Sequence, residues 1–260
     1  MNSELTFSPF LALFFREVRR FMRVIFQTLA TPLINTTLYL LIFGVSIGRQ
    51  ISNIHDYPYL AFLIPGLVMM GTLRNAFDNA TGSIVTAKFC GELEDLRIVP
   101  LSPVQIAWAN GLGSLVRGLL VGGVTLCIGI LFYGLHQEEF LTIQYPFLMF
   151  ILLSFGGFGF AQLGLAVSMI SKSFEHVNAI NTFILLPLIY LGGVFFSLDH
   201  LHPFWQGLSQ MNPLLYLVNG LRYAMLGASD IPIERALVVT LFTTIFFHKA
   251  LSIHYWPINI

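Results

Sequence analysis

The sequence predicts an all-α polytopic membrane protein that forms a single transmembrane domain over residues 1–260. Of the 260 residues, 56% are hydrophobic and only 10% are charged, whereas soluble domains carry about 25% charged residues. The mean hydropathy is +0.77. The apolar residues also gather in runs of about 20, the length that a helix needs to cross the hydrocarbon core of a bilayer. Lipid is therefore the expected solvent for most of the chain.

Residues 5–22, which precede the first apolar run, predict an amphipathic helix in the membrane interface. Phe14 and other apolar side chains alternate with Arg16, Glu17, Arg19 and Arg20 at roughly helical spacing, which places these four on the polar face. Such a helix buries its apolar face at the level of the lipid head groups, and anionic lipids attract its basic face. The alternative, a cytoplasmic extension of the first span, agrees less well with the amphipathic pattern. Membrane lipids are thus a predicted partner.

Six apolar runs are predicted to span the membrane. They cover residues 24–48, 57–79, 104–133, 140–170 and 177–197, with a last run that begins near Ala236. The last is the weakest, because its clean apolar stretch ends at His248 and Lys249. In the third run, Gly118 and Gly122 have the spacing of small residues that let membrane helices pack closely.

Residues 199–223 lack the pattern of a span. They contain Pro203, Pro213 and several side-chain amides, so a lipid-exposed helix here would be broken twice. Irregular backbone at membrane depth is tolerated only where protein or water covers it. This segment therefore predicts a re-entrant helical hairpin on the extracytoplasmic side, before the last span.

The distribution of basic residues predicts the orientation, because lysine and arginine accumulate in short cytoplasmic loops. With the N-terminus inside, the cytoplasmic segments hold Arg16, Arg19, Arg20, Arg23, Lys88, Arg97, Lys172 and Lys249, and the outer segments hold Arg49, Arg222 and Arg235. Both termini are therefore expected in the cytoplasm.

Few residues suggest a chemical site. Arg117 is the one charge deep in a predicted span; it either lines a path for an anionic ligand or snorkels to a helix-end carbonyl. Asp78, four residues after Arg74, is the only acid in the predicted spans. His200 and His202 have no third metal ligand nearby and are expected to be loop histidines. No nucleophile elbow is present, so catalysis by this chain is not expected.

The sequence gives no indication that this chain itself binds a cofactor or a nucleic acid. The chain has no G-x-x-x-x-G-K-[ST] sequence, so it is not expected to bind ATP, magnesium or any other cofactor itself. Its 13 basic and 13 acidic residues cancel, which gives no indication of a nucleic-acid partner.

The predicted cytoplasmic loop at residues 81–103 is longer than a connection between two spans requires. Acidic and apolar residues are interleaved in it before Pro100 and Pro103, namely Glu92, Leu93, Glu94, Asp95 and Leu96. This pattern predicts an amphipathic helix closed by a proline-marked turn. An amphipathic helix outside the membrane suggests docking on a partner protein.

Three sequence elements in this order of spans resemble the ABC type-2 permease family, the membrane domains of ATP-binding-cassette exporters. They are PGLVMMG at 65–71, GELEDLRIVPLSP at 91–103 and MNPLLYLVNGLR at 211–222. The chain is most similar to the bacterial subgroup of nodulation-factor and drug exporters. The resemblance implies a homodimer in the bacterial inner membrane, a central path, and two copies of a separate ATPase that binds ATP and magnesium.

The resemblance also assigns roles to residues. It implies a coupling helix on the ATPase, formed by Gly91, Glu92, Leu93, Glu94, Asp95, Leu96, Arg97, Pro100, Leu101 and Ser102, and a re-entrant region shaped by Asn212, Pro213, Gly220 and Arg222. The implied function is outward transport of a lipid-like, glycolipid or drug-like substrate. An ion-coupled carrier is the alternative, disfavoured by the lack of carboxylates at mid-membrane. A membrane enzyme such as an acyltransferase is a second alternative.

Overall fold

The computed structural model describes residues 3–48, 54, 57–91, 100–138 and 141–255. Within these ranges the regular secondary structure is helical, with turns and short loops between the helices and one isolated β-bridge between Ile54 and Tyr57. The elements are α1 (Ser3–Met22), α2 (Ile25–Tyr39), η1 (Leu40–Ile47), α3 (Tyr59–Cys90), α5 (Pro103–Gln137), α6 (Pro146–Ile170), α7 (Phe174–Ile180), η3 (Asn181–Leu185), α8 (Leu186–Tyr190), η4 (Leu198–His200), α9 (Pro203–Gln210), α10 (Pro213–Leu226) and α11 (Ile233–Tyr255). The predicted all-α class is confirmed.

Four helical segments in the described ranges are long and apolar enough to cross a membrane. They are Ile25–Ile47, Tyr59–Cys90, Pro103–Gln137 and Pro146–Ile170, which correspond to the first four predicted spans. The fifth predicted span, 177–197, is helical only to Tyr190, with the π-helical turn η3 in its middle. Helix α11 covers the sixth. The total of six crossings stays a prediction.

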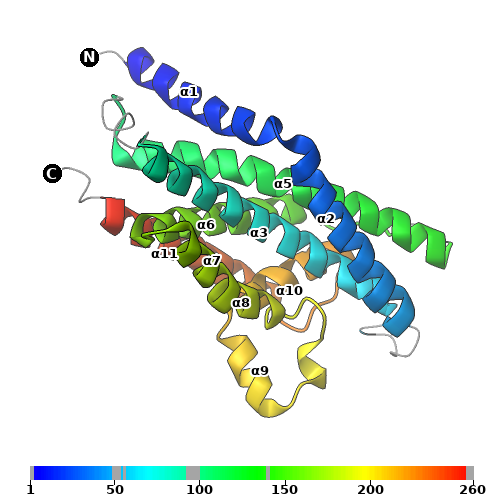
Figure 1. Cartoon of the computed structure of the whole chain (residues 1–260). Coiled ribbons are helices and arrows are strands. Elements are labelled where there is room, and N and C mark those ends of the chain that lie inside the picture. The colour runs from blue at the N-terminus through cyan, green and yellow to red at the C-terminus, as the bar shows by residue number, and fades with distance from the viewer. Residues whose placement is uncertain (1–2, 49–53, 55–56, 92–99, 139–140, 256–260) are drawn as a thin grey trace.

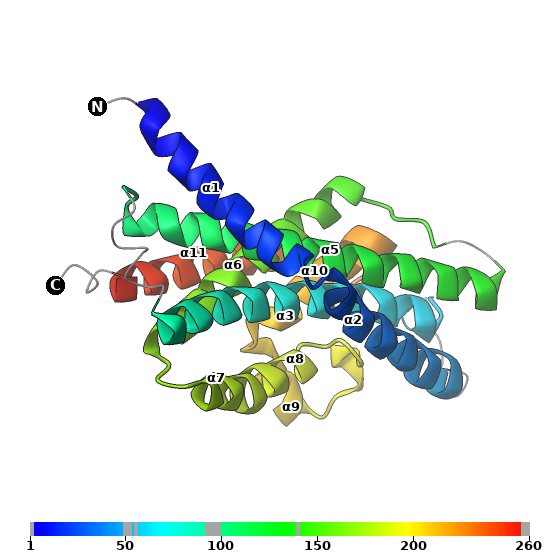
Figure 2. The same cartoon turned by 45° about the horizontal axis from the view of Figure 1, so that its top comes forward.

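The long helices run alongside one another in a bundle, and α7, α8 and α9 lie to one side of it in both views (Figures 1 and 2). The start of α1, the end of α3, the start of α5 and the end of α11 lie at the same end of the bundle (Figure 1). This arrangement agrees with two termini on one side of a membrane, although it does not identify that side.

Helix α3 lies at the centre of the bundle because small residues of its neighbours let them approach it. A Cβ atom added to Gly118 of α5 would lie 2.7 Å from the carbonyl oxygen of Thr72 and 3.0 Å from the Cβ of Ala76. Gly122 of α5 is also against Thr72, and Gly164 of α6 lies against the carbonyl oxygen of Phe77. The close packing predicted from the glycine spacing is therefore confirmed.

One predicted boundary is wrong. Residues 81–90, assigned to the loop 81–103, continue α3 as far as Cys90, and the helix ends at Gly91 with a left-handed φ of 79°. The helix extends because residues such as Ile84 and Val85 are buried against the bundle. Ser102 then caps α5, since its Oγ accepts a hydrogen bond from the Gln105 N–H at 3.3 Å. The loop between the two helices is thus shorter than predicted.

The segment predicted to be a re-entrant hairpin forms two helices, each with a proline in its first turn. Helix α9 begins at Pro203 and α10 at Pro213. Helix α10 extends to Leu226, beyond the predicted end at residue 223, and is buried against α3, α6 and α11. Helix α9 lies away from the bundle (Figure 1). The break at both prolines is confirmed, and entry into the membrane stays a prediction.

Candidate binding site between the helices

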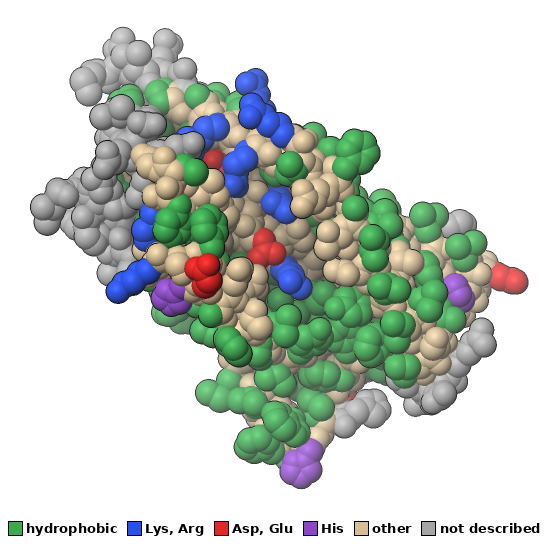
Figure 3. Space-filling view, in the orientation of Figure 1, with side chains coloured by type: hydrophobic (Ala, Val, Ile, Leu, Met, Phe, Trp, Pro, Cys, Tyr) green, Lys and Arg blue, Asp and Glu red, His purple; other side chains and the backbone are tan. Residues whose placement is uncertain are grey.

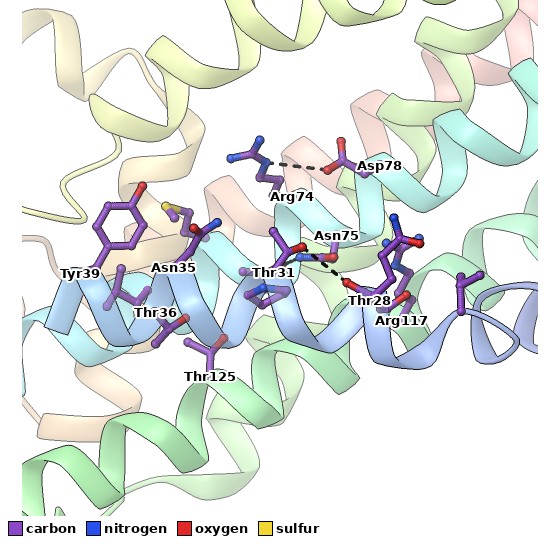
Figure 4. Close-up of a pocket in the computed structure, with 16 residues that line it drawn as sticks. Thr28, Thr31, Asn35, Thr36, Tyr39, Arg74, Asn75, Asp78, Arg117 and Thr125 are labelled. Carbon is purple, nitrogen blue, oxygen red and sulfur yellow. Dashed lines mark hydrogen bonds and ion pairs between the residues drawn. The ribbon is translucent and has the colours of Figure 1, made fainter. Parts of the chain in front are cut away.

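A polar pocket with a volume of about 410 Å³ lies between helices that are otherwise apolar. Its polar walls come from α2, α3 and α5 (Figure 4). The polar side chains that line it are Gln27, Thr28, Thr31, Asn35, Thr36, Tyr39, Arg74, Asn75, Asp78, Arg117 and Thr125. Polar groups at membrane depth are expensive to bury and usually have a function.

Helix α2 contributes a stripe of uncharged polar residues. Gln27, Thr31 and Asn35 follow one another at four-residue spacing, which places them on one face of the helix, and all three are exposed. Pro32 lies in the same stretch and has no N–H, so the carbonyl of Thr28 lacks its usual helical donor. This stripe was not predicted from the sequence, because the run contains no charge. The helical spacing of its polar residues was the available signal.

Helices α3 and α5 contribute the charges of the pocket. Arg74 Nε lies 3.7 Å from Asp78 Oδ2, and Asn181 Nδ2 donates to Asp78 Oδ1 at 3.2 Å. Arg117 Nη1 donates to Asn79 Oδ1 at 3.3 Å. Two guanidinium groups and one carboxylate thus line the pocket among the described residues, and the resulting net positive charge favours anionic or strongly polar groups.

A buried hydrogen-bond network connects this pocket to α1. Asn79 is 2% exposed, and its Nδ2 donates to Ser114 Oγ at 3.0 Å. Arg20 of α1 donates from Nη2 to the Asn79 carbonyl oxygen at 2.9 Å and to Asn79 Oδ1 at 3.2 Å. Burial lowers the pKa of Arg20, and the nearby Glu17 carboxylate opposes that shift. Arg20 and Arg117 thus both donate to the side-chain oxygen of Asn79. A displacement of α1 would therefore move a hydrogen-bond partner of Arg117, which lines the pocket.

The structure places the residues predicted for the interfacial helix and the path as follows. Arg117 lines the pocket, and Arg20 is linked to it because both arginines donate to Asn79 Oδ1. Phe14 is half-buried against the core cluster of α3, α5 and α6. Arg16 and Arg19 are exposed on α1 and line a second pocket. The interfacial position of α1 itself stays a prediction.

The predicted coupling residues fall mostly outside the described residues. Glu92, Leu93, Glu94, Asp95, Leu96 and Arg97 belong to the undescribed stretch 92–99. Gly91 ends α3, while Pro100, Leu101 and Ser102 lead into α5. The two ends of this segment lie at the end of the bundle where α1 begins (Figure 1). Their role in coupling stays a prediction.

The residues predicted for the re-entrant region form a separate cluster. The Arg222 guanidinium donates to the Gly193 carbonyl oxygen at 2.9 Å and to Asn219 Oδ1 at 3.2 Å. Asn212 caps α10, because its Oδ1 accepts from the Leu214 N–H at 3.0 Å. Pro213 is the first residue of α10, and Gly220 packs against Leu152 and Ala236. These residues hold the hairpin together and do not line the polar pocket.

The residues that match known proteins include both the pocket and the hairpin. A family model described as ABC-2 type transporter matches residues 8–226. The inner membrane transport permease YadH of Escherichia coli (strain K12) is 37% identical over 244 residues, which cover 94% of this chain and 91% of YadH. Nodulation protein J of Rhizobium leguminosarum bv. trifolii is 27% identical over 210 residues, with 76% of this chain and 72% of that protein covered. Nodulation protein J of Rhizobium meliloti (strain 1021) is 25% identical over 210 residues, with 78% and 74% covered.

Proposed function

This chain belongs to the ABC-2 type transporter family, and from that premise we propose that it is the permease subunit of an ATP-driven exporter. Its relatives include inner membrane transport permeases, and its long apolar helices suit the same membrane. In this proposal a separate ATPase supplies the energy, and the substrate leaves the cell as a lipid-like, glycolipid or drug-like molecule.

The observation that supports this proposal most is the polar pocket between α2, α3 and α5. Its arginines and uncharged polar groups suit the polar head of an amphipathic molecule. Directly beside the polar stripe, α2 exposes Leu33, Ile34 and Leu38, along which an apolar tail would lie. The pocket thereby combines the two surfaces that such a molecule needs during its passage.

A partner ATPase is proposed because the sequence has no phosphate-binding loop. ATP and magnesium would then bind to the partner, and the segment 91–102 between α3 and α5 would dock on it. The arrangement of helix ends supports this, since the segment emerges at the end of the bundle where α1 begins and α11 ends (Figure 1).

A second copy of the chain is proposed because the polar stripe of α2 lies open on the single chain. Gln27, Thr31 and Asn35 are exposed within a helix that is otherwise apolar enough to span a membrane. Polar groups in a span almost always face a protein interior or a water-filled cavity rather than lipid. A homodimer that faces the two stripes toward each other would satisfy this requirement and form a central path.

The pairing of the carboxylates favours ATP-driven over ion-coupled transport. Asp78 lies against Arg74, and Glu17 is 3.1 Å from Arg20. A carboxylate that carries a coupling proton must gain and lose its charge during the cycle, whereas each of these two carboxylates has a fixed guanidinium partner in the structure.

The pocket is tested by changing Arg117 in the complex of the chain with its ATPase. We expect Arg117→Gln to raise the concentration of anionic amphiphile needed to stimulate ATP hydrolysis by about 10-fold or more, because a hydrogen bond to a charged group contributes about 1.5–3 kcal/mol. Arg235→Gln is the matched control, since Arg235 is exposed and lies outside the pocket. Equal stimulation of the wild type and Arg117→Gln would refute the pocket as a substrate site.

A further inference from the structure

A second pocket, with a volume of about 570 Å³, lies between α1 and the last turns of α3. Four arginines line it on one side, Arg16, Arg19, Arg20 and Arg23. Their spacing places Arg16, Arg19 and Arg20 on one flank of α1, and Arg23 follows directly in the turn after the helix. Basic side chains gather over α1 on the face shown in Figure 3. The transport function proposed above does not require this pocket.

The position of α1 beside this pocket is fixed by a buried stripe on the same helix. Leu13, Glu17 and Phe21 recur every four residues and are 7%, 1% and 2% exposed. Gly113 of α5 leaves room for the stripe, since a Cβ atom there would lie 2.6 Å from the Cβ of Glu17. The sequence pattern predicts Glu17 on the polar face with the arginines, but in the structure its side chain is turned inward and is 1% exposed. The arginine flank is consequently held at a defined place against α3.

The charges in this pocket do not balance. Among the described residues that line it, Glu17 is the one carboxylate. It already accepts from Ser83 Oγ at 2.8 Å and pairs with Arg20 at 3.1 Å and Arg16 at 3.3 Å. The backbone N–H of Arg23 donates to the Arg19 carbonyl oxygen at 3.1 Å, but within the described ranges the side chains of Arg19 and Arg23 make no hydrogen bond or ion pair. One buried anion among four cations leaves a strong positive excess, which an anion from outside the chain would neutralise.

The surroundings of the pocket indicate which anion binds. Phe15 forms part of its wall and is 50% exposed, and Met22 and Phe26 continue an exposed apolar row at 47% and 88%. A small inorganic anion would leave these side chains uncovered. An anionic lipid would place its head group among the arginines and its acyl chains along the row, close to the start of the first span.

We propose that this pocket is a binding site for the phosphodiester head group of an anionic glycerophospholipid. Arginine suits this ligand because its guanidinium group donates two parallel hydrogen bonds to phosphate oxygens. The expectation from the sequence was only a general attraction of α1 to anionic membranes. The structure assigns one pocket, with Arg19 and Arg23 as the two arginines free to bind the phosphate.

Native mass spectrometry of the purified full chain in detergent tests this site, with phosphatidylglycerol and phosphatidylcholine added separately. We expect one phosphatidylglycerol per chain to bind at least about 10-fold more tightly than phosphatidylcholine. The double variant Arg19→Gln, Arg23→Gln should lose about 10- to 30-fold in phosphatidylglycerol affinity, as two arginines near a lipid surface contribute. The control is Lys172→Gln with Arg235→Gln, two exposed positions elsewhere that change the net charge equally; it should bind like the wild type.

A second variant keeps the test decisive if the double variant does not fold. Phe15→Glu changes an exposed side chain at the edge of the pocket and places a carboxylate beside the arginines, so it should weaken phosphatidylglycerol binding while leaving phosphatidylcholine binding unchanged. Equal affinity of the wild type for the two lipids would overturn the proposal. So would an equal loss in the control, or displacement of phosphatidylglycerol by millimolar inorganic phosphate, which would identify a site for the free ion.

Discussion

Replacing Arg222 by methionine tests the cluster that holds the predicted re-entrant hairpin. The Arg222 side chain is 1% exposed and lies 3.8 Å from Asp230, whose side chain is equally buried. Its guanidinium carbon is 3.6 Å from the centre of the Phe62 ring, and its nitrogens donate to Gly193 and Asn219. Arg222 therefore joins α10 to α3, to the turn before η4 and to the loop before α11.

The expected loss of stability follows from these contacts. Removing one partner of a buried ion pair costs about 3–5 kcal/mol, because the other charge is left without compensation. Asp230 keeps two donors, the Ser197 hydroxyl at 2.7 Å and the Leu198 N–H at 3.0 Å, which lowers this cost. The lost contact with Phe62 adds up to about 2 kcal/mol for a desolvated cation–π pair. We expect Arg222→Met to lower the free energy of unfolding by about 3 kcal/mol.

Reversible unfolding in mixed micelles, followed by tryptophan fluorescence, measures this loss. The control is Arg74→Met, which removes an ion pair whose side chains are 42% and 36% exposed and should cost about 0.5 kcal/mol or less. A double-mutant cycle with Asp230→Asn should give a coupling energy of about 1–2 kcal/mol. A loss below about 1 kcal/mol for Arg222→Met, or a cycle without measurable coupling, would refute the assignment of Arg222 as the centre of this cluster.

The remaining predictions concern coupling, topology and packing. Leu93→Ala should weaken co-purification of the ATPase more than Glu92→Gln, because buried apolar anchors contribute more to binding than rim charges; equal retention in both would contradict the coupling helix. In a chain without its native cysteines, Gln210→Cys should react with an impermeant thiol reagent from outside intact cells and Lys172→Cys only after lysis, whereas the reverse pattern would invert the topology. Gly118→Leu should prevent close contact of α3 with α5 and lower the unfolding temperature sharply, and an unchanged temperature would show that the helices can separate without cost.

The sequence predicted the helices best where apolar runs are long and uncharged. The runs that became α2 with η1, α5 and α6 could be recognised because a bilayer requires a specific length of apolar helix. The end of α3 was misplaced because Arg74 and Asp78 marked what looked like a membrane surface, whereas the helix continues to Cys90. Charge indicates exposure to water only when no partner in the fold neutralises it, and here the two residues neutralise each other.

The site was predicted less completely than the fold. Arg117 was recognised because a lone charge in an apolar run is rare, but its neighbours on α2 are uncharged and gave no such signal. Glu17 was assigned to the polar face of α1, because the local sequence does not reveal Gly113 or Ser83, which meet it from α5 and α3. Contacts between helices distant in the sequence decide which polar residues turn inward, and a single sequence does not contain that information.

Uptake into inverted inner-membrane vesicles tests the central claim most directly. Vesicles that contain the chain and the proposed ATPase partner would be given a fluorescent anionic amphiphile, with ATP or with a proton gradient alone. The account predicts accumulation that requires ATP hydrolysis, persists after a protonophore collapses the gradient, and falls several-fold in Arg117→Gln. Accumulation driven by the gradient without nucleotide would contradict it and identify an ion-coupled carrier.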